Sequence, residues 1–219
     1  MNFKRIVNVS ICLAMLSVST GLWAQNESRW QNVDINQQNR EPRRASFFAY
    51  ESQDKAKGFD KKESANYLSM EGMWKFNFAK DHNKRPANFF AVNYDDSKWK
   101  DFPVPGLFEL NGYGDATYKN VGYAWATQFD PNPPYISETN NYTGSYRRTF
   151  DLPTDWKGKD VYFHVGSATS NLTLWVNGKY VGYSEDSKVA AEFNISKYLK
   201  PGKNLIAMQV MRWCDGSYF

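Results

Sequence analysis

The sequence predicts an all-β protein, a jelly-roll β-sandwich preceded by a signal peptide and an extended arm. Trp74, Phe76 and Phe78 alternate with polar residues, which is the period of a half-buried strand. Asn177-Gly178 separates two apolar segments and is a strong hairpin signal, because both residues of such a turn adopt positive φ. Short strands recur with no helical stretch between them, which favours a sandwich over a closed barrel.

Residues 1–24 have the pattern of a secretory signal peptide. Two basic residues precede an apolar run, and small residues lead to a cleavage site after Ala24. Polar residues interrupt the run, so a membrane-spanning helix fits it less well. Cys12 lies inside the run without a small-residue cleavage site before it, which argues against a lipid anchor. We expect an exported protein, periplasmic or extracellular, without a membrane anchor.

Charge and cysteine content narrow the class of protein further. After removal of residues 1–24, 25 basic and 23 acidic residues remain, so the net charge falls from +4 to +2. This balance does not favour nucleic-acid binding. Arg40, Arg43 and Arg44 fit a solvated arm with local acidic partners better than a phosphate site. Cys214 would then be the single cysteine, so the fold must depend on its core rather than on an intrachain disulfide.

The rest of the chain divides at residue 67. Residues 25–66 are polar and without a clear period, and we expect an extended arm pinned by aromatic residues at positions 47, 48 and 50. Residues 67–219 form the predicted jelly-roll domain. Its last strand is apolar on both faces except at Gln209, which is typical of an interior strand, so we expect the domain to be incomplete at its carboxyl end. The expected strands are residues 73–78, 146–150, 161–165, 172–176, 180–183 and 205–211, and residues 92–101 are expected to form a loop anchored by Trp99.

Residues 103–143 form a long loop rich in Gly, Pro, Asn and aromatic residues, and such loops usually carry function. Aromatic rings can cover the apolar face of a pyranose while Asn and Asp bond its hydroxyl groups. Packing against another domain is an equally good interpretation, and both stay open. The rings in question belong to Tyr113, Tyr118, Tyr123, Trp125 and Tyr135.

The sequence offers no convincing pair of catalytic carboxyl groups. Glycoside hydrolysis needs two that flank the bond, about 5 to 5.5 Å apart if configuration is retained. Glu185-Asp186 fits a solvated turn, and Asp95-Asp96 fits a turn or a helix cap. His82 and His164 are isolated, so neither indicates a catalytic triad or a zinc site.

Several motifs occur in the order found in the β-galactosidases of glycoside hydrolase family 2, which this chain resembles over nearly all of residues 25–219. They are Trp30 and residues 39–42, 67–76, 104–106, 118–121, 143–146, 175–187 and 212–218. The Val-Asn-Gly hairpin is similar across the family, including β-glucuronidases and β-mannosidases. Asn120-Val121 and residues 213–218 resemble the large β-galactosidases in particular. Phe108 and Cys214 depart mildly from the Trp and Ser that are common there.

The resemblance implies a galactose-binding-domain-like region of an enzyme that hydrolyses terminal non-reducing β-D-galactosides with retention. In that family the catalytic glutamates and a magnesium site lie in a later (β/α)8 barrel, so we expect no catalytic residue in this chain and no hydrolysis by it alone. Asn120 and Asp215 would bind the substrate, and Asp215 would also hold a sodium ion at the galactose subsite. Plain loop and turn roles for these two residues stay open. The expected partners are the β-galactoside and the carboxyl-terminal domains, and homo-oligomerisation is left open.

Two other functions remain compatible with the sequence. A free-standing, lectin-like carbohydrate-binding module would bind galactose through residues 103–143. A family 2 enzyme of other specificity, such as a β-glucuronidase, would have no use for Asn120 and Asp215 as they are placed. A domain of a larger enzyme should instead expose an apolar face and bind galactose weakly. Asn141 and Asn171 lie in sequons, which matter only in a host that glycosylates exported proteins.

Overall fold

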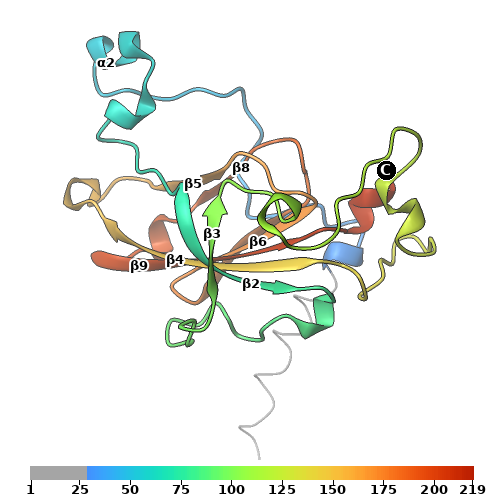
Figure 1. Cartoon of the computed structure of the whole chain (residues 1–219). Helices are drawn as coiled ribbons and strands as arrows, with labels where there is room; N and C mark the ends of the chain where they lie inside the picture. Colours follow the sequence, from blue (N-terminus) through green and yellow to red (C-terminus); the bar gives the residue numbers. More distant parts are fainter. Residues whose placement is uncertain (1–28) are drawn as a thin grey trace, which may run out of the picture.

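The computed structural model describes residues 29–219 (Figure 1), so the predicted signal peptide and its cleavage site lie outside the described residues. Two antiparallel sheets dominate: seven strands in the order β1-β7-β6-β9-β4-β2-β3, and the pair β5-β8. The all-β prediction is confirmed. Within residues 29–219, no helix is both long and apolar enough to cross a membrane.

The large sheet consists of β1 Gln37–Gln38, β2 Gly72–Ala79, β3 Lys100–Val104, β4 Thr143–Leu152, β6 Asn171–Val176, β7 Lys179–Ser184 and β9 Gly202–Met211, and the small one of β5 Tyr162–Val165 and β8 Ala191–Asn194. The described residues contain the α-helix α2 Gln53–Gly58 and the 3-10 helices η1 Arg29–Gln31, η2 Lys61–Glu63, η3 His82–Lys84, η4 Glu109–Asn111, η5 Ala124–Thr127, η6 Thr154–Trp156, η7 Ser196–Tyr198 and η8 Asp215–Tyr218.

β9 lies between β6 and β4 in the middle of the large sheet, as its apolar sequence predicted. It pairs with the whole of β4, from Thr143 opposite Met211 to Leu152 opposite Gly202. Successive side chains of a strand point to opposite faces, so each strand contributes to two cores. We call the face toward β5 and β8 the inner face and the opposite one the outer face.

The inner face carries the main hydrophobic core. Leu174 of β6 and Phe193 of β8 are fully buried against each other's sheet, and Ile206 of β9 joins them. At the other end, the rings of Phe76 and Phe102 lie 4.4 Å apart between β2 and β3. The two sheets therefore form the layers of a sandwich of unequal width.

The outer face is covered by loops instead of a second sheet. Phe89 and Phe90 pack on Trp175 of β6, and the rings of Phe90 and Trp175 stack at 5.0 Å. Trp99, the predicted anchor of this loop, contacts the rings of Phe89 and Tyr94. A further apolar cluster on this face contains Trp30, Ile136, Tyr183, Met211, Trp213, Cys214 and Tyr218.

The predicted hairpin at Asn177-Gly178 joins β6 to β7, and both residues have positive φ, at 50° and 81°. The Asn177 side chain accepts a hydrogen bond from the Leu205 amide at 2.9 Å and donates to the Tyr198 carbonyl at 2.9 Å. Asparagine therefore serves twice here: it adopts the left-handed turn conformation and it ties the hairpin to β9.

Strands β1, β3 and β8 were not predicted. Residues 100–101, expected in a loop, begin β3, which lies at the edge of the large sheet and contains Pro103. An edge strand tolerates proline because one side of it needs no partner. β8 has four residues that pair with β5, and its two apolar residues are too few to reveal a period.

The amino-terminal arm bridges the edges of the two sheets instead of running free. Gln37 of β1 pairs with Ser184 of β7, and the Glu41 amide donates to the Glu192 carbonyl of β8 at 2.8 Å. The arginine cluster fastens this crossing to acidic and polar groups, as the sequence interpretation expected. Arg40 donates to the Ser184 hydroxyl, Arg43 pairs with Asp186, and Arg44 pairs with Glu192.

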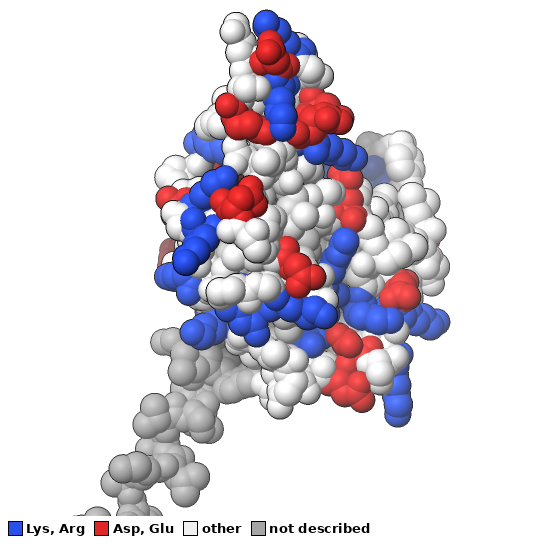
Figure 2. All heavy atoms as spheres, turned by 90° about the vertical axis from the view of Figure 1, so that its left-hand side faces the viewer, with Lys and Arg blue, Asp and Glu red and all other residues white. Residues whose placement is uncertain are grey.

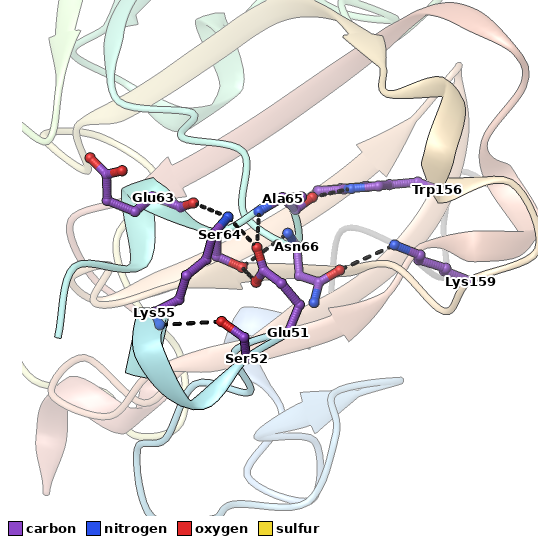
Figure 3. Close-up of polar contacts among 9 residues, drawn as sticks. All are labelled: Glu51, Ser52, Lys55, Glu63, Ser64, Ala65, Asn66, Trp156 and Lys159. Carbon is purple, nitrogen blue, oxygen red and sulfur yellow. Dashed lines mark hydrogen bonds and ion pairs between the residues drawn. The ribbon is translucent and has the colours of Figure 1, made fainter. Parts of the chain in front are cut away.

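Beyond this crossing the arm leaves the body as a projection, residues 51–66, which contains α2 and η2 (Figure 1). Neither helix buries a residue. Figure 3 shows its centre, where the Glu51 carboxylate accepts hydrogen bonds from Lys55, Ser64 and the Ala65 amide. The Trp156 indole donates to the Ala65 carbonyl at 2.7 Å and anchors the returning chain. Basic and acidic side chains are interspersed over the projection and the face below it (Figure 2).

Candidate functional site

Asp215 lies in the short helix η8, directly after the segment that continues β9. Its side chain is buried, with the residue 2% exposed, and its Oδ1 accepts a hydrogen bond from the Gly216 amide at 3.1 Å. The turn is closed on both sides, since the Cys214 amide donates to Ser217 Oγ and the Ser217 amide donates to the Cys214 carbonyl. The carboxylate is therefore held in place by its own backbone.

Glu185 and Cys214 surround Asp215. The potential ligand atoms of the three residues lie within 4.8 Å of one another. Tyr183 donates its hydroxyl to Glu185 Oε1 at 2.6 Å. Burial raises the pKa of the Glu185 carboxyl to about 8, against the effect of the Tyr183 hydrogen bond, and burial also raises the pKa of Asp215. Burial thus opposes the simultaneous ionisation of both carboxyl groups.

The chemistry of the three groups suits a hard cation better than a soft one. Carboxylate oxygens of Asp215 and Glu185 are typical ligands of hard ions such as those of groups 1 and 2. Burial raises the pKa of the Cys214 thiol to about 12, which disfavours the thiolate in the protein without a metal ion. A hard cation at this place would need further oxygen ligands in addition to the two carboxyl groups.

A cavity of about 230 Å³ lies beside η8. The residues that line it include Trp125, Trp213 and Glu185, together with the serines at positions 170, 187 and 217. Flat apolar rings next to hydrogen-bonding groups are the mixture that recognises sugars. Cys214, Gly216 and Ser217 of the same turn line this cavity, whereas Asp215 itself does not.

Tyr218 joins this turn to the long loop. Its hydroxyl donates to the Tyr135 carbonyl at 2.8 Å and accepts from the Asn132 amide at 3.1 Å. Its ring also contacts Trp125 edge to face, with centroids 5.0 Å apart. The predicted loop is therefore structured, and one end of it is fixed to the same helix that carries Asp215.

Asn120, the second predicted substrate-binding residue, lies exposed in this loop. Within residues 29–219 no hydrogen bond links Asn120 to Asp215, and the neighbouring Tyr118 is 88% exposed. The structure thus leaves Asn120 open to solvent and Asp215 buried, without bringing them into contact.

The loop aromatics divide between the two roles that the sequence left open. Tyr113 packs on the main core and Trp125 on the cluster around Tyr218. Tyr118, Tyr123 and Tyr135 are exposed. Two of the five rings therefore hold the loop in place, and three present a surface.

The other candidate groups have structural partners. Asp95 accepts a hydrogen bond from the Ser97 amide, as expected for a turn. His82 is buried beside Thr143, and His164 pairs with Glu192 on the surface. Asp96 pairs with Arg147.

Sequence reasoning missed Glu185. Glu185-Asp186 was interpreted as a solvated turn, but both residues are half-buried, Asp186 in an ion pair with Arg43 and Glu185 beside Asp215. The alternation of β7 carried one step further, which places residue 185 on the side of Tyr183, was the signal that could have found it.

A family model and individual relatives identify the same protein family. The sequence model described as "Glycosyl hydrolases family 2, sugar binding domain" matches residues 67–219. A β-galactosidase of Priestia megaterium is 38% identical over 196 residues, which are 89% of this chain and 19% of that protein. A β-galactosidase of Psychromonas ingrahamii is 35% identical over 86% of this chain and 18% of its own length. The chain thus spans about a fifth of the length of these curated relatives.

Among solved structures, a Bacteroides uniformis β-glucuronidase is similar at 25% identity and a TM-score of 0.48, over 66% of this chain and 14% of that one. A β-glucuronidase of an uncultured Clostridium is similar at 19% identity and a TM-score of 0.45, over 65% and 21% of the two chains. The match of the family model to residues 67–219 covers most of the chain, and the chain therefore belongs to glycosyl hydrolase family 2, of which it contains the sugar-binding domain.

Proposed function

We propose that this chain is the amino-terminal sugar-binding part of an exported β-galactosidase, which in complete form hydrolyses terminal non-reducing β-D-galactosides with retention of configuration. The observation that carries the proposal is the buried Asp215 carboxylate, held in a closed turn beside a cavity whose lining includes tryptophan and serine residues. The β-galactosidases that are 34 to 38% identical over most of the chain support the choice of sugar.

In this proposal Asp215 binds a hydroxyl group of the galactose and a sodium ion beside it. A carboxylate oxygen accepts hydrogen bonds from sugar hydroxyls and is a hard ligand for a small cation. Its Oδ1 accepts a hydrogen bond from the Gly216 amide, and the carboxyl group also contacts that of Glu185, so Glu185 belongs to the immediate surroundings of the proposed ion. Asn120 contributes from the exposed loop, where its amide is accessible to a sugar bound against another part of the protein.

We assign the catalytic carboxyl groups, and the magnesium ion of the family, to parts of the protein outside residues 29–219. Glu185 lines the cavity and lies next to the buried Asp215, but the two carboxyl groups are in hydrogen-bond contact with each other. A retaining glycosidase needs its two carboxyl groups about 5 to 5.5 Å apart, with the glycosidic bond between them. A pair in mutual contact leaves no space for that bond, so the chain alone should not hydrolyse galactosides.

The exposed apolar surface of the long loop fits a domain that packs against others. Leu107, Leu110 and Val121 are 62%, 82% and 81% exposed, together with Tyr118 and Tyr123. Large exposed apolar side chains, where they gather on one surface, mark interaction sites. A second candidate, a free-standing lectin-like module, is favoured by the same exposed tyrosines and by the cavity, and it predicts galactose binding by the chain alone.

Kinetics on the intact protein test the proposal. We expect hydrolysis of a chromogenic β-galactoside, little hydrolysis of the matching β-glucuronide, and activity that rises with sodium. Asp215→Asn should lower kcat/KM by about 100-fold or more, since it removes a charged contact to substrate and ion. Asp186→Asn is the matched control, because Asp186 pairs only with Arg43 in the described residues.

Two results would contradict the proposal. Normal activity of Asp215→Asn would remove Asp215 from the site. Calorimetric binding of galactose by residues 25–219 alone, with no hydrolysis by any longer form, would favour the lectin-like module. Export is tested separately, since the mature protein from the periplasm or medium should begin at Gln25.

A further inference from the structure

The segment that carries Asp215 is fastened by the side chain of Asn141, which lies two residues before β4. The Trp213 amide donates to Asn141 Oδ1 at 2.9 Å, and Asn141 Nδ2 donates to the Trp213 carbonyl at 3.1 Å. Asn141 is 0% exposed. Two reciprocal hydrogen bonds therefore join this amide to a single residue two positions before Asp215.

These bonds replace a strand ladder that has ended. β4 and β9 finish their pairing at Thr143 and Met211, and one more bond follows, from the Arg212 amide to the Tyr142 carbonyl at 2.8 Å. At the next position the Asn141 side chain provides the donor and the acceptor that a strand backbone would provide. An asparagine amide can do this because it carries both groups, whereas a carboxylate or a hydroxyl group does not offer the same pair.

The position of Asn141 explains why the bonds matter for Asp215. Trp213 is itself buried, so its amide and carbonyl groups would lack water if Asn141 were replaced by an apolar residue. The chain beyond Trp213 then depends on the closed turn at Cys214 and Ser217 and on the Tyr218 hydroxyl. Of these contacts, those of Asn141 are the ones that fix where the turn starts relative to the sheet.

We propose that Asn141 is a positioning residue for the sugar site, which holds the Trp213 backbone so that the Asp215 carboxylate points to the galactose. This inference rests on the proposed function of Asp215. It also changes the interpretation of the sequon at Asn141: the side-chain nitrogen is committed to the Trp213 carbonyl inside the fold, so glycosylation and the folded site exclude each other.

The chain contains a matched control. Asn171 begins β6 and is also 0% exposed in a sequon, but within the described residues neither its Nδ2 nor its Oδ1 has a hydrogen-bond partner. Asn→Leu at position 141 or 171 makes the same chemical change at a buried position, next to β4 or at the start of β6. An effect of the apolar side chain itself would appear in both variants, and an effect of losing the bonds to Trp213 only in Asn141→Leu.

The test uses Asn141→Leu, Asn141→Asp and Asn171→Leu in the intact protein. Hydrogen exchange of peptides from residues 212–219 should become faster in Asn141→Leu and stay unchanged in Asn171→Leu. With a chromogenic β-galactoside, Asn141→Leu should lose about 10 to 100-fold in kcat/KM, as second-sphere positioning residues typically do, while Asn171→Leu stays within about twofold. Asn141→Asp keeps the acceptor for the Trp213 amide, so its losses should lie between those of wild type and Asn141→Leu.

The exchange and kinetic results test the role of Asn141 separately from the proposed function. Unchanged exchange at residues 212–219 in Asn141→Leu, or in Asn141→Asp if the leucine variant does not fold, overturns the inference. Faster exchange with unchanged kcat and KM also overturns it, because the contact is then structural alone. A wild-type protein that hydrolyses no β-galactoside overturns the proposed function instead, and exchange then still decides whether Asn141 holds the segment.

Discussion

The inner and outer faces of the large sheet are buried by different means. On the inner face, apolar side chains of β6 and β9 meet those of β5 and β8, so two regular layers close on each other. On the outer face, loops and short helices cover a row that includes Thr143, Ser145 and Arg147 of β4. The candidate site and the buried ionisable groups around it all lie with the loop-covered clusters.

These two kinds of burial allow one sandwich to provide both stability and a binding site. A face closed by a second sheet leaves no place for unpaired polar groups, because their burial costs free energy. A face closed by loops can present side chains and backbone groups in irregular directions, which is what recognition needs. We expect mutations on the inner face to act on stability, and those on the outer face to act on local order, pH dependence and binding.

The largest expected effect concerns the inner core. Phe193→Ala should lower the free energy of unfolding by about 3 to 5 kcal/mol, since the ring is fully buried between two sheets that cannot close the cavity. Phe89→Ala removes an equally large ring from a loop on the outer face, which can collapse, and should cost less. Denaturant unfolding of both variants checks the comparison, and an equal or larger loss for Phe89→Ala would contradict it.

The next effect concerns the buried cation of the outer face. Arg147 pairs with Asp96 at 2.6 Å and donates to the carbonyls of Phe89, Ala91 and Tyr94. Arg147→Met should therefore cost about 2 to 3 kcal/mol, because charged hydrogen bonds to the covering loop are lost. Hydrogen exchange should show the loss as faster opening of residues 89–99. Uniform destabilisation of both faces, without that local signature, would speak against separate roles.

The sequence predicted those elements of the two faces whose pattern lies within a few neighbouring residues. β9 and the Asn177-Gly178 hairpin were predicted because their patterns lie within a few residues. β3 and β8 were missed because an edge strand with Pro103 and a strand of four residues carry little period. Family resemblance predicted a site role for Asp215, and this stays a prediction, whereas Glu185 and Asn141 come close to the segment of Asp215 through contacts made across 30 or more residues of chain. Such contacts leave no local pattern, and the sequon at Asn141 carries no information about its contact with Trp213.

A pH effect distinguishes the outer face further. Burial lowers the pKa of His82 to about 3, helped by the neighbouring Arg85 charge. An unfolded histidine titrates near 6.5, so between about pH 6.5 and 3 the unfolded chain binds more protons than the folded one. The free energy of unfolding therefore decreases as the pH is lowered through this range, by up to about 1.4 kcal/mol per pH unit. His82→Gln should flatten this part of the curve, whereas Phe193→Ala should shift the whole curve without changing its slope. Parallel curves for wild type and His82→Gln would exclude the effect.

The smallest expected effect is a change in the free energy of unfolding at Asn171. The sign of this change distinguishes the outer face from the inner face of β6. The inner neighbour in β6, Leu172, is buried in the apolar core, whereas Asn171 has an amide that no described residue bonds. A buried polar group without partners costs free energy, so Asn171→Leu should leave stability unchanged or raise it by up to about 1 kcal/mol. Leu172→Asn, the reverse change one residue away, should be clearly destabilising. If Asn171→Leu destabilised the protein as Leu172→Asn does, the amide would have a partner or a ligand in solution, and the loop-covered face would extend its binding surface to the start of β6.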